Sequence, residues 1–215
     1  MMRSTETKRL IQDLARQAGS HHHLNANSFD LSLLIAGGLS LAVAAAMVLV
    51  LIGVRPDFGV MVQRAPFHYK IAVTLSMVCA GFVFARRAGQ PDCTELPLIA
   101  LLPALLLLAL GASTDTSGLI VTGNSGISVP ACVGAILMVS LPPLAVILGV
   151  LRSRAPTRLV VAGATAGLLS GAVGATAYTL VCKNDGELFV AVWYSAAVLI
   201  MTGLGAAIGR RALAW

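Results

Sequence analysis

Two of the four cysteines in this chain are the residues best placed to do chemistry. Cys132 and Cys182 are expected near the same face of a membrane, because each falls close to the end of a long apolar segment. Two thiols in an oxidising space can form a disulfide or bind a soft metal ion. The alternatives are a structural disulfide and two buried apolar thiols. The sequence thus offers a sensing or transient soft-metal site at this pair, and no permanent cofactor.

A metal site would need more ligands than these two thiols, because structural zinc sites are tetrahedral and use four. His68 is expected near the same face and is the candidate third ligand. Cys79 and Cys93 are expected on the opposite, reducing side, so they are not predicted to join the pair.

No arrangement of residues predicts catalysis. Intramembrane serine proteolysis needs a histidine base in the membrane, and all four histidines lie outside the apolar segments. No segment holds an Asp in its core, and the chain has neither an HExxH motif nor a glycine-rich phosphate loop. Ion-coupled transport is disfavoured, because Lys70 lies at a segment end where its side chain can reach water. We predict that the protein is not an enzyme, while a passive channel for a neutral solute stays open.

The elements that position these residues are predicted to be transmembrane helices. Of the 215 residues, 57% are hydrophobic and 11% are charged, against about 25% charged in soluble domains. The first apolar run is too long for a cleaved signal peptide, whose core has about 7–15 residues. Since a span needs roughly 20 apolar residues, we predict an all-α integral membrane protein. Its six spans would lie at about 30–53, 69–85, 96–113, 129–151, 159–181 and 188–209.

The distribution of Lys and Arg predicts the orientation. Eleven of these residues fall on the side of the two termini and four on the other. Cytoplasmic loops carry the excess of positive charge, so both termini are predicted to be cytoplasmic. The net charge of +6 then reflects topology, and direct nucleic-acid binding is not expected. In this topology Cys132 and Cys182 differ in height by about 6 Å, which would allow lateral contact.

Residues 1–28 form a polar tail ahead of the membrane domain, residues 29–215. Within the tail, Leu10, Ile11 and Leu14 fall on one face of a predicted amphipathic helix. So short a helix is marginal alone in water and needs a surface to lie against. A cytoplasmic protein partner and the inner leaflet are both open. His21, His22 and His23 are interpreted as a solvated linker.

Small residues recur every four positions in the fifth predicted span, at Gly163, Gly167 and Gly171. Gly205 and Gly209 repeat the spacing in the sixth. Such stripes let helices approach closely. We expect packing within one chain, with a homodimer face as the alternative.

The second half of the chain carries a series of short motifs in a fixed order. They are Leu141-Pro142-Pro143-Leu144, Arg154-Ala155-Pro156-Thr157-Arg158, the Gly/Ala-rich span, Cys182 and Phe189-Val190-Ala191-Val192-Trp193-Tyr194. In these segments the chain resembles the NrsF family of bacterial membrane proteins. Together with six spans and a short tail, they make the likeness cover nearly the whole chain.

The resemblance implies a negative regulator, an anti-sigma factor that holds an extracytoplasmic-function sigma factor at the bacterial inner membrane. Heavy-metal or oxidative stress would release the sigma factor, with Cys132 and Cys182 as the sensing pair. The Arg154–Arg158 loop and the tail would respond on the inner side. A small passive transporter or metal exporter, and a membrane assembly factor, are the alternative functions.

Overall fold

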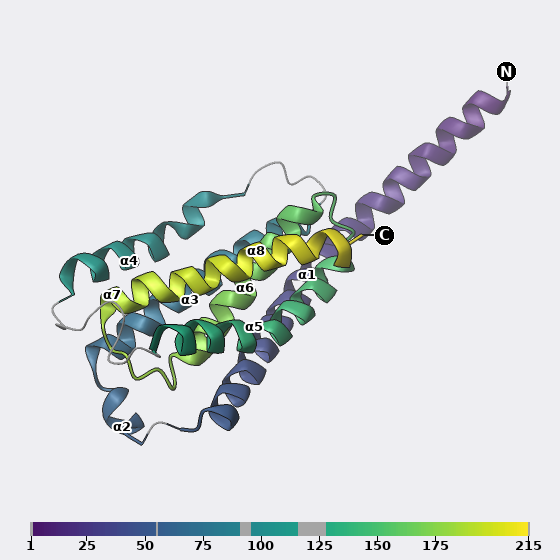
Figure 1. Cartoon of the computed structure of the whole chain (residues 1–215). Coiled ribbons are helices and arrows are strands. Elements are labelled where there is room, and N and C mark those ends of the chain that lie inside the picture. The colour runs from purple at the N-terminus through teal and green to yellow at the C-terminus, as the bar shows by residue number, and fades with distance from the viewer. Residues whose placement is uncertain (1, 55, 91–95, 116–127, 215) are drawn as a thin grey trace.

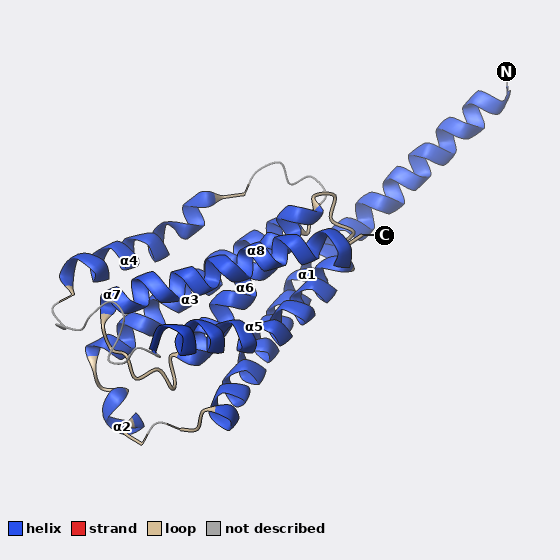
Figure 2. Ribbon diagram, in the orientation of Figure 1, coloured by secondary structure: helices blue, strands red, loops and turns tan. Residues whose placement is uncertain are grey.

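The computed structural model of the chain describes residues 2–54, 56–90, 96–115 and 128–214. Of the first 27 residues, only Arg9, Gln12 and Asp13 have described side chains. Every regular element in the described ranges is a helix (Figure 2), which confirms the all-α prediction for them. The α-helices are α1 (Met2–Leu51), α2 (Phe58–Met61), α3 (Ala65–Ala88), α4 (Leu102–Thr114), α5 (Ser128–Arg152), α6 (Leu159–Tyr178), α7 (Glu187–Phe189) and α8 (Ser195–Ala212). A 3₁₀ turn, η1 (Leu98–Leu101), precedes α4, and a π-helical turn, η2 (Val190–Tyr194), joins α7 to α8.

Five helical segments are long and apolar enough to cross a membrane. They are Ser28–Leu51, Ala65–Ala88, Val129–Arg152, Leu159–Tyr178 and Glu187–Ala212. Ala65–Ala88, which contains the shortest predicted span, is 24 residues long, the same length as Ser28–Leu51. The span predicted at 96–113 is instead a shorter apolar helix, Leu98–Thr114. The described residues therefore hold five helices that are long and apolar enough to cross a membrane, where the sequence predicted six spans.

Helix α1 runs without a break from the tail into the first membrane segment. Its N-terminal half projects well beyond the rest of the molecule in Figure 1. Residues 21–23, which the sequence analysis interpreted as a solvated linker, lie inside this helix. The tail and the first span therefore form one continuous helix.

Helix α6 is the centre of the bundle and packs against α1, α3, α5 and α8. Its glycines make this position possible, because a Cβ at Gly163 would collide with the Gly205 carbonyl and one at Gly167 with the Met201 carbonyl. The α8 glycines face back, since a Cβ at Gly205 would meet the Gly163 carbonyl. Packing within one chain is confirmed for these glycine stripes. Because they are occupied by each other, they offer no free face for a homodimer.

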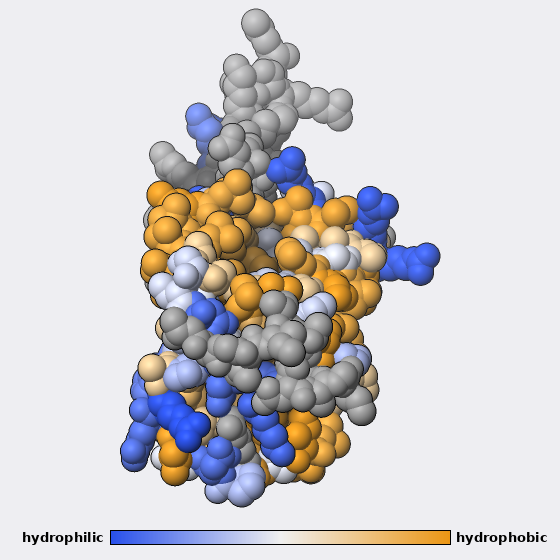
Figure 3. Space-filling model, turned by 60° about the vertical axis from the view of Figure 1, so that its left-hand side comes forward, coloured by the Kyte–Doolittle hydropathy of each residue, from blue (hydrophilic) through white to orange (hydrophobic). Residues whose placement is uncertain are grey.

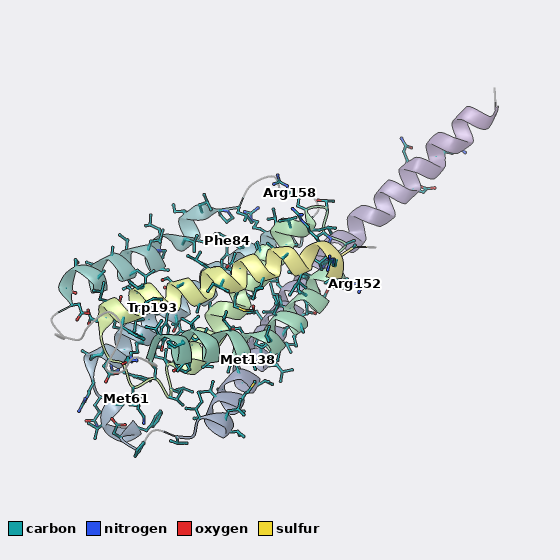
Figure 4. All side chains as sticks on the ribbon, viewed as in Figure 1. Met61, Phe84, Met138, Arg152, Arg158 and Trp193 are labelled. Carbon is teal, nitrogen blue, oxygen red and sulfur yellow. The ribbon has the colours of Figure 1, made fainter. Side chains whose placement is uncertain are left out.

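The two ends of the bundle differ in what they carry. The projecting part of α1 and the end of α8 lie at one end of the molecule in Figure 1. Arg152 and Arg158, which flank the α5–α6 loop, are labelled at that same end in Figure 4. Between the ends, the face in Figure 3 is dominated by apolar side chains. This distribution suits a bundle with two polar ends and an apolar girdle.

Candidate functional site

The predicted sensing cysteines meet at the end of the bundle opposite the tail. Cys132 lies in the first turns of α5, and Cys182 follows the end of α6. Both side chains are only 1% exposed. They are free thiols that lie beside each other. The structure thus brings together two residues for which the helix heights allowed lateral contact, while their role remains a prediction.

Two tyrosines close around the thiols. The rings of Tyr178 and Tyr194 are 6.2 Å apart between centroids. Tyr178 lies beside Cys132. Tyr194 ends the π-helical turn η2 and is completely buried. Its hydroxyl lies beside Cys182 but makes no hydrogen bond with any described residue. The wider turn therefore brings a buried polar group to the thiols, and π turns are frequent at functional sites.

A buried ion pair lies next to the cysteine pair. The Lys70 ammonium is 2.8 Å from the Asp185 carboxylate, and their side chains are 2% and 23% exposed. The sequence placed Lys70 at the water-accessible end of its span and predicted no buried ionisable group. That prediction was wrong. Lys70 is turned inward because Asp185, in the loop after α6, supplies a partner that offsets the desolvation of its charge.

The same surroundings change the acidity of Cys182. The neighbouring Cys132 thiol lowers the pKa of Cys182, and the Lys70 ammonium acts in the same direction while burial opposes both. The Cys182 sulfur also lies 3.7 Å from the Asn184 carbonyl oxygen. The thiolate is the form of cysteine that attacks an oxidant or binds a metal ion.

The structure does not bring His68 to the thiols. Its Nδ1 is 3.0 Å from the Arg64 carbonyl oxygen, one turn earlier and exposed. Among the described residues, no group of three His, Cys, Asp or Glu side chains is arranged to hold a metal ion. Cys79 lies in α3 and is exposed, and Cys93 falls outside the described residues. A metal at this place would therefore rest on Cys132 and Cys182.

At the opposite end, the part of α1 that follows the tail contacts the C-terminal end of α3 and the α5–α6 loop. The Arg154 guanidinium carbon lies 4.4 Å from the centre of the Phe29 ring. That ring is 6% exposed and lies so close to Gly89 that a Cβ there would be 2.6 Å from it. One residue on, the Asp30 carboxylate is 2.6 Å from the Arg86 guanidinium. We call Phe29, Asp30, Arg86, Gly89 and Arg154 the inner clamp.

The predicted partner-binding residues divide into two groups. Arg154 belongs to the inner clamp and is half-buried, whereas Arg158 is exposed. The side chains of Leu10, Ile11 and Leu14 lie outside the described residues, although the backbone there is helical. The structure thus places one basic loop against the root of the tail.

Comparison with known proteins shows which family the chain belongs to. The family model described as NrsF, negative regulator of sigma F, matches residues 17–215. The chain belongs to the NrsF family. It is 32% identical over 216 residues to the probable anti-sigma-F factor NrsF of Azospira oryzae, covering 98% of this chain and all of the relative. It is also 32% identical over 191 residues to the anti-sigma-F factor NrsF of Caulobacter vibrioides, covering 85% of this chain and 88% of that protein. No solved structure matches the chain.

Reasoning from the sequence missed two parts of the candidate site around Cys132 and Cys182. The Lys70–Asp185 pair joins residues 115 positions apart, and no local pattern signals such a pairing. A single lysine in an otherwise apolar segment was the available signal, because such a charge needs a partner when it is buried. Tyr194 was quoted within a motif, but nothing in that motif indicated a π turn.

Proposed function

We propose that this NrsF-family chain is a membrane anti-sigma factor. It holds an extracytoplasmic-function sigma factor at the bacterial inner membrane and keeps it from RNA polymerase. The observation that carries the proposal is family membership across residues 17–215, joined to a bundle with a helix that projects from one end. A projecting helix on a membrane body is suited to capturing a soluble partner beside the membrane.

The proposed topology has six spans and both termini in the cytoplasm. The segment Leu98–Thr114 has 17 residues, or about 25 Å of helix against a hydrocarbon core of about 30 Å. In Figure 1 α4 runs along the bundle beside the other helices. The arginines of the α5–α6 loop lie at the end from which the tail projects, which is the end that the positive-inside rule assigns to the cytoplasm (Figure 4).

The sigma factor is held by the tail and by the basic loop at its root. Leu10, Ile11 and Leu14 supply an apolar face, and Arg154 and Arg158 supply positive charge beside it. The cation–π contact between Arg154 and Phe29 supports this arrangement, because it ties the loop to the same helix that carries the tail. The alternative is that the apolar face of the tail binds the membrane surface.

Release is controlled by the cysteine pair. Under oxidative stress, the Cys132 and Cys182 thiols would form one S–S bond, passing two electrons and two protons to a two-electron thiol oxidant. Under heavy-metal stress, both thiols would lose their protons and bind a soft cation. Either product changes how α5 meets the end of α6, and α6 touches α1, which leads to the tail. A switch of this kind needs two arrangements that differ in their affinity for the sigma factor.

A pull-down from the native bacterium in mild detergent tests the sequestration. Three chains are compared: the full chain, a chain lacking residues 1–24, and the full chain with Arg154→Ala and Arg158→Ala. The full chain should capture a sigma factor, and both altered chains should capture less. Arg64→Ala, an arginine of the opposite end, is the matched control and should capture as much as the full chain.

Other results point elsewhere. A sigma factor that is caught equally by all chains would keep the function and move the contact to other parts of the inner face. A membrane subunit in place of a sigma factor would favour an assembly factor. The absence of any partner, with solute flux in liposomes, would favour a transporter.

A further inference from the structure

Lys70 stands out because it is the largest charged side chain inside the bundle. It lies in the first two turns of α3, and its side chain is 2% exposed. Its ammonium is bound at 2.8 Å by Asp185. Asp185 belongs to the connecting segment, residues 179–186, which links α6 to α7. The ion pair thus ties that segment to a helix far from it in sequence.

The connecting segment also carries Cys182, three residues before Asp185. It is held to α6 by backbone bonds such as that from the Cys182 N–H to the Tyr178 carbonyl, at 3.1 Å. Beyond that, the 2.8 Å ion pair fastens it to α3. The Lys70 charge lies near enough to act on both thiols. A displacement of this segment would therefore separate Cys182 from Cys132.

We propose that Lys70 is a positioning residue for the cysteine pair. Its ion pair with Asp185 pins the connecting segment to α3 and so holds Cys182 against Cys132. The inference builds on the proposed sensing role of the two cysteines. The positioning itself is measured without a sigma factor.

The experiment measures how fast the two thiols form a disulfide in membranes that contain the full chain. Cys79→Ser and Cys93→Ser leave the pair as the only cysteines. Diamide is the oxidant: the two thiols lose two protons and two electrons, one S–S bond forms, and the N=N bond of diamide is reduced to the hydrazine. The fraction of free thiol is read by maleimide labelling after denaturation.

Four variants are compared in that background. Lys70→Met and Asp185→Asn both break the ion pair, and misplaced reacting groups should slow the reaction by about tenfold or more. Lys70→Arg keeps a cation that can bind Asp185 and should restore a rate within about threefold of the parent. Lys183→Met removes an exposed positive charge beside Cys182 and is the matched control, with little change expected.

Asp185→Asn separates positioning from simple electrostatics. It leaves the Lys70 charge near the thiols without its anionic partner, so a purely electrostatic role predicts faster oxidation. Positioning predicts slower oxidation. If Lys70→Met fails to insert, Asp185→Asn decides alone.

Rates equal to the parent in Lys70→Met and Asp185→Asn would overturn the inference, as would an equal slowing by Lys183→Met. Slow oxidation in these variants, together with an oxidised parent that still retains its sigma factor, would keep the positioning role and refute the sensing role.

Discussion

Around Cys182, single residues have different energetic roles. The Lys70–Asp185 pair replaces the hydration of the Lys70 ammonium with one short contact, and removing Asp185 would leave that buried charge without this compensation. The Tyr194 hydroxyl is buried beside the same thiols but makes no hydrogen bond with a described residue. A polar atom of this kind adds nothing to stability, because it has lost water without gaining a partner.

The first prediction concerns that hydroxyl. Tyr194→Phe should leave the free energy of unfolding unchanged within about 1 kcal/mol, or raise it, because no bond is lost. Thermal unfolding in detergent gives the comparison. Tyr69→Phe is the control, since the Tyr69 hydroxyl donates to the Leu107 carbonyl at 3.1 Å and its loss should cost about 1 kcal/mol. A larger loss for Tyr194→Phe than for Tyr69→Phe would show that Tyr194 has a bonding partner.

The second prediction concerns Phe29 and Arg154. Because the guanidinium lies over the ring, Phe29→Leu and Arg154→Ala should lose less together than the sum of their separate losses, by about 0.5–1 kcal/mol. A double-mutant cycle on thermal stability measures this coupling. Arg158→Ala combined with Phe29→Leu is the control and should be additive. Equal coupling energies in both cycles would show that the contact between Arg154 and the Phe29 ring does not stabilise the protein.

Among the elements, α6 decides how the bundle packs. Its small residues were visible in the sequence, and their spacing predicted close approach to another helix. That the partner is α8 of the same chain was not determined by the spacing, because a second copy could present the same stripe. The regular helix of α4 starts later than the predicted span at 96–113. The apolar run there continues through Pro97 and Pro103, and the proline at the start of α4 confines the regular helix to Leu102–Thr114.

The third prediction tests the α6–α8 contact. Gly167→Ala places a methyl group against the Met201 carbonyl, where neither backbone can move without separating the helices. We expect a loss of about 1–3 kcal/mol in thermal unfolding. The control is Gly203→Ala on α8, where a Cβ meets nothing within 4 Å and helix propensity favours alanine by up to about 1 kcal/mol. Equal stability of the two variants would contradict this packing.

Across the whole molecule, two sites lie at opposite ends of one bundle. The cysteine pair, with Lys70 and Tyr194, lies at one end, and the inner clamp fastens the tail at the other. The sequence indicated that Cys132 and Cys182 could come into lateral contact, because helix heights follow from residue counts. It could not predict the clamp, because contacts such as Phe29 with Gly89 depend on how α1 and α3 pack. The continuous α1 offers a physical link between the membrane bundle and the proposed sigma-binding tail.

The most direct test of the proposed function is the amount of sigma factor that stays on washed membranes before and after a thiol oxidant or cadmium is added. With the parent chain, the sigma factor should stay bound at first and leave after treatment. With Cys132→Ser and Cys182→Ser together, it should stay bound throughout, while Cys79→Ser should behave like the parent. Release from the double variant at the parent's rate would contradict the account, because the cysteine pair would then not control the sigma factor.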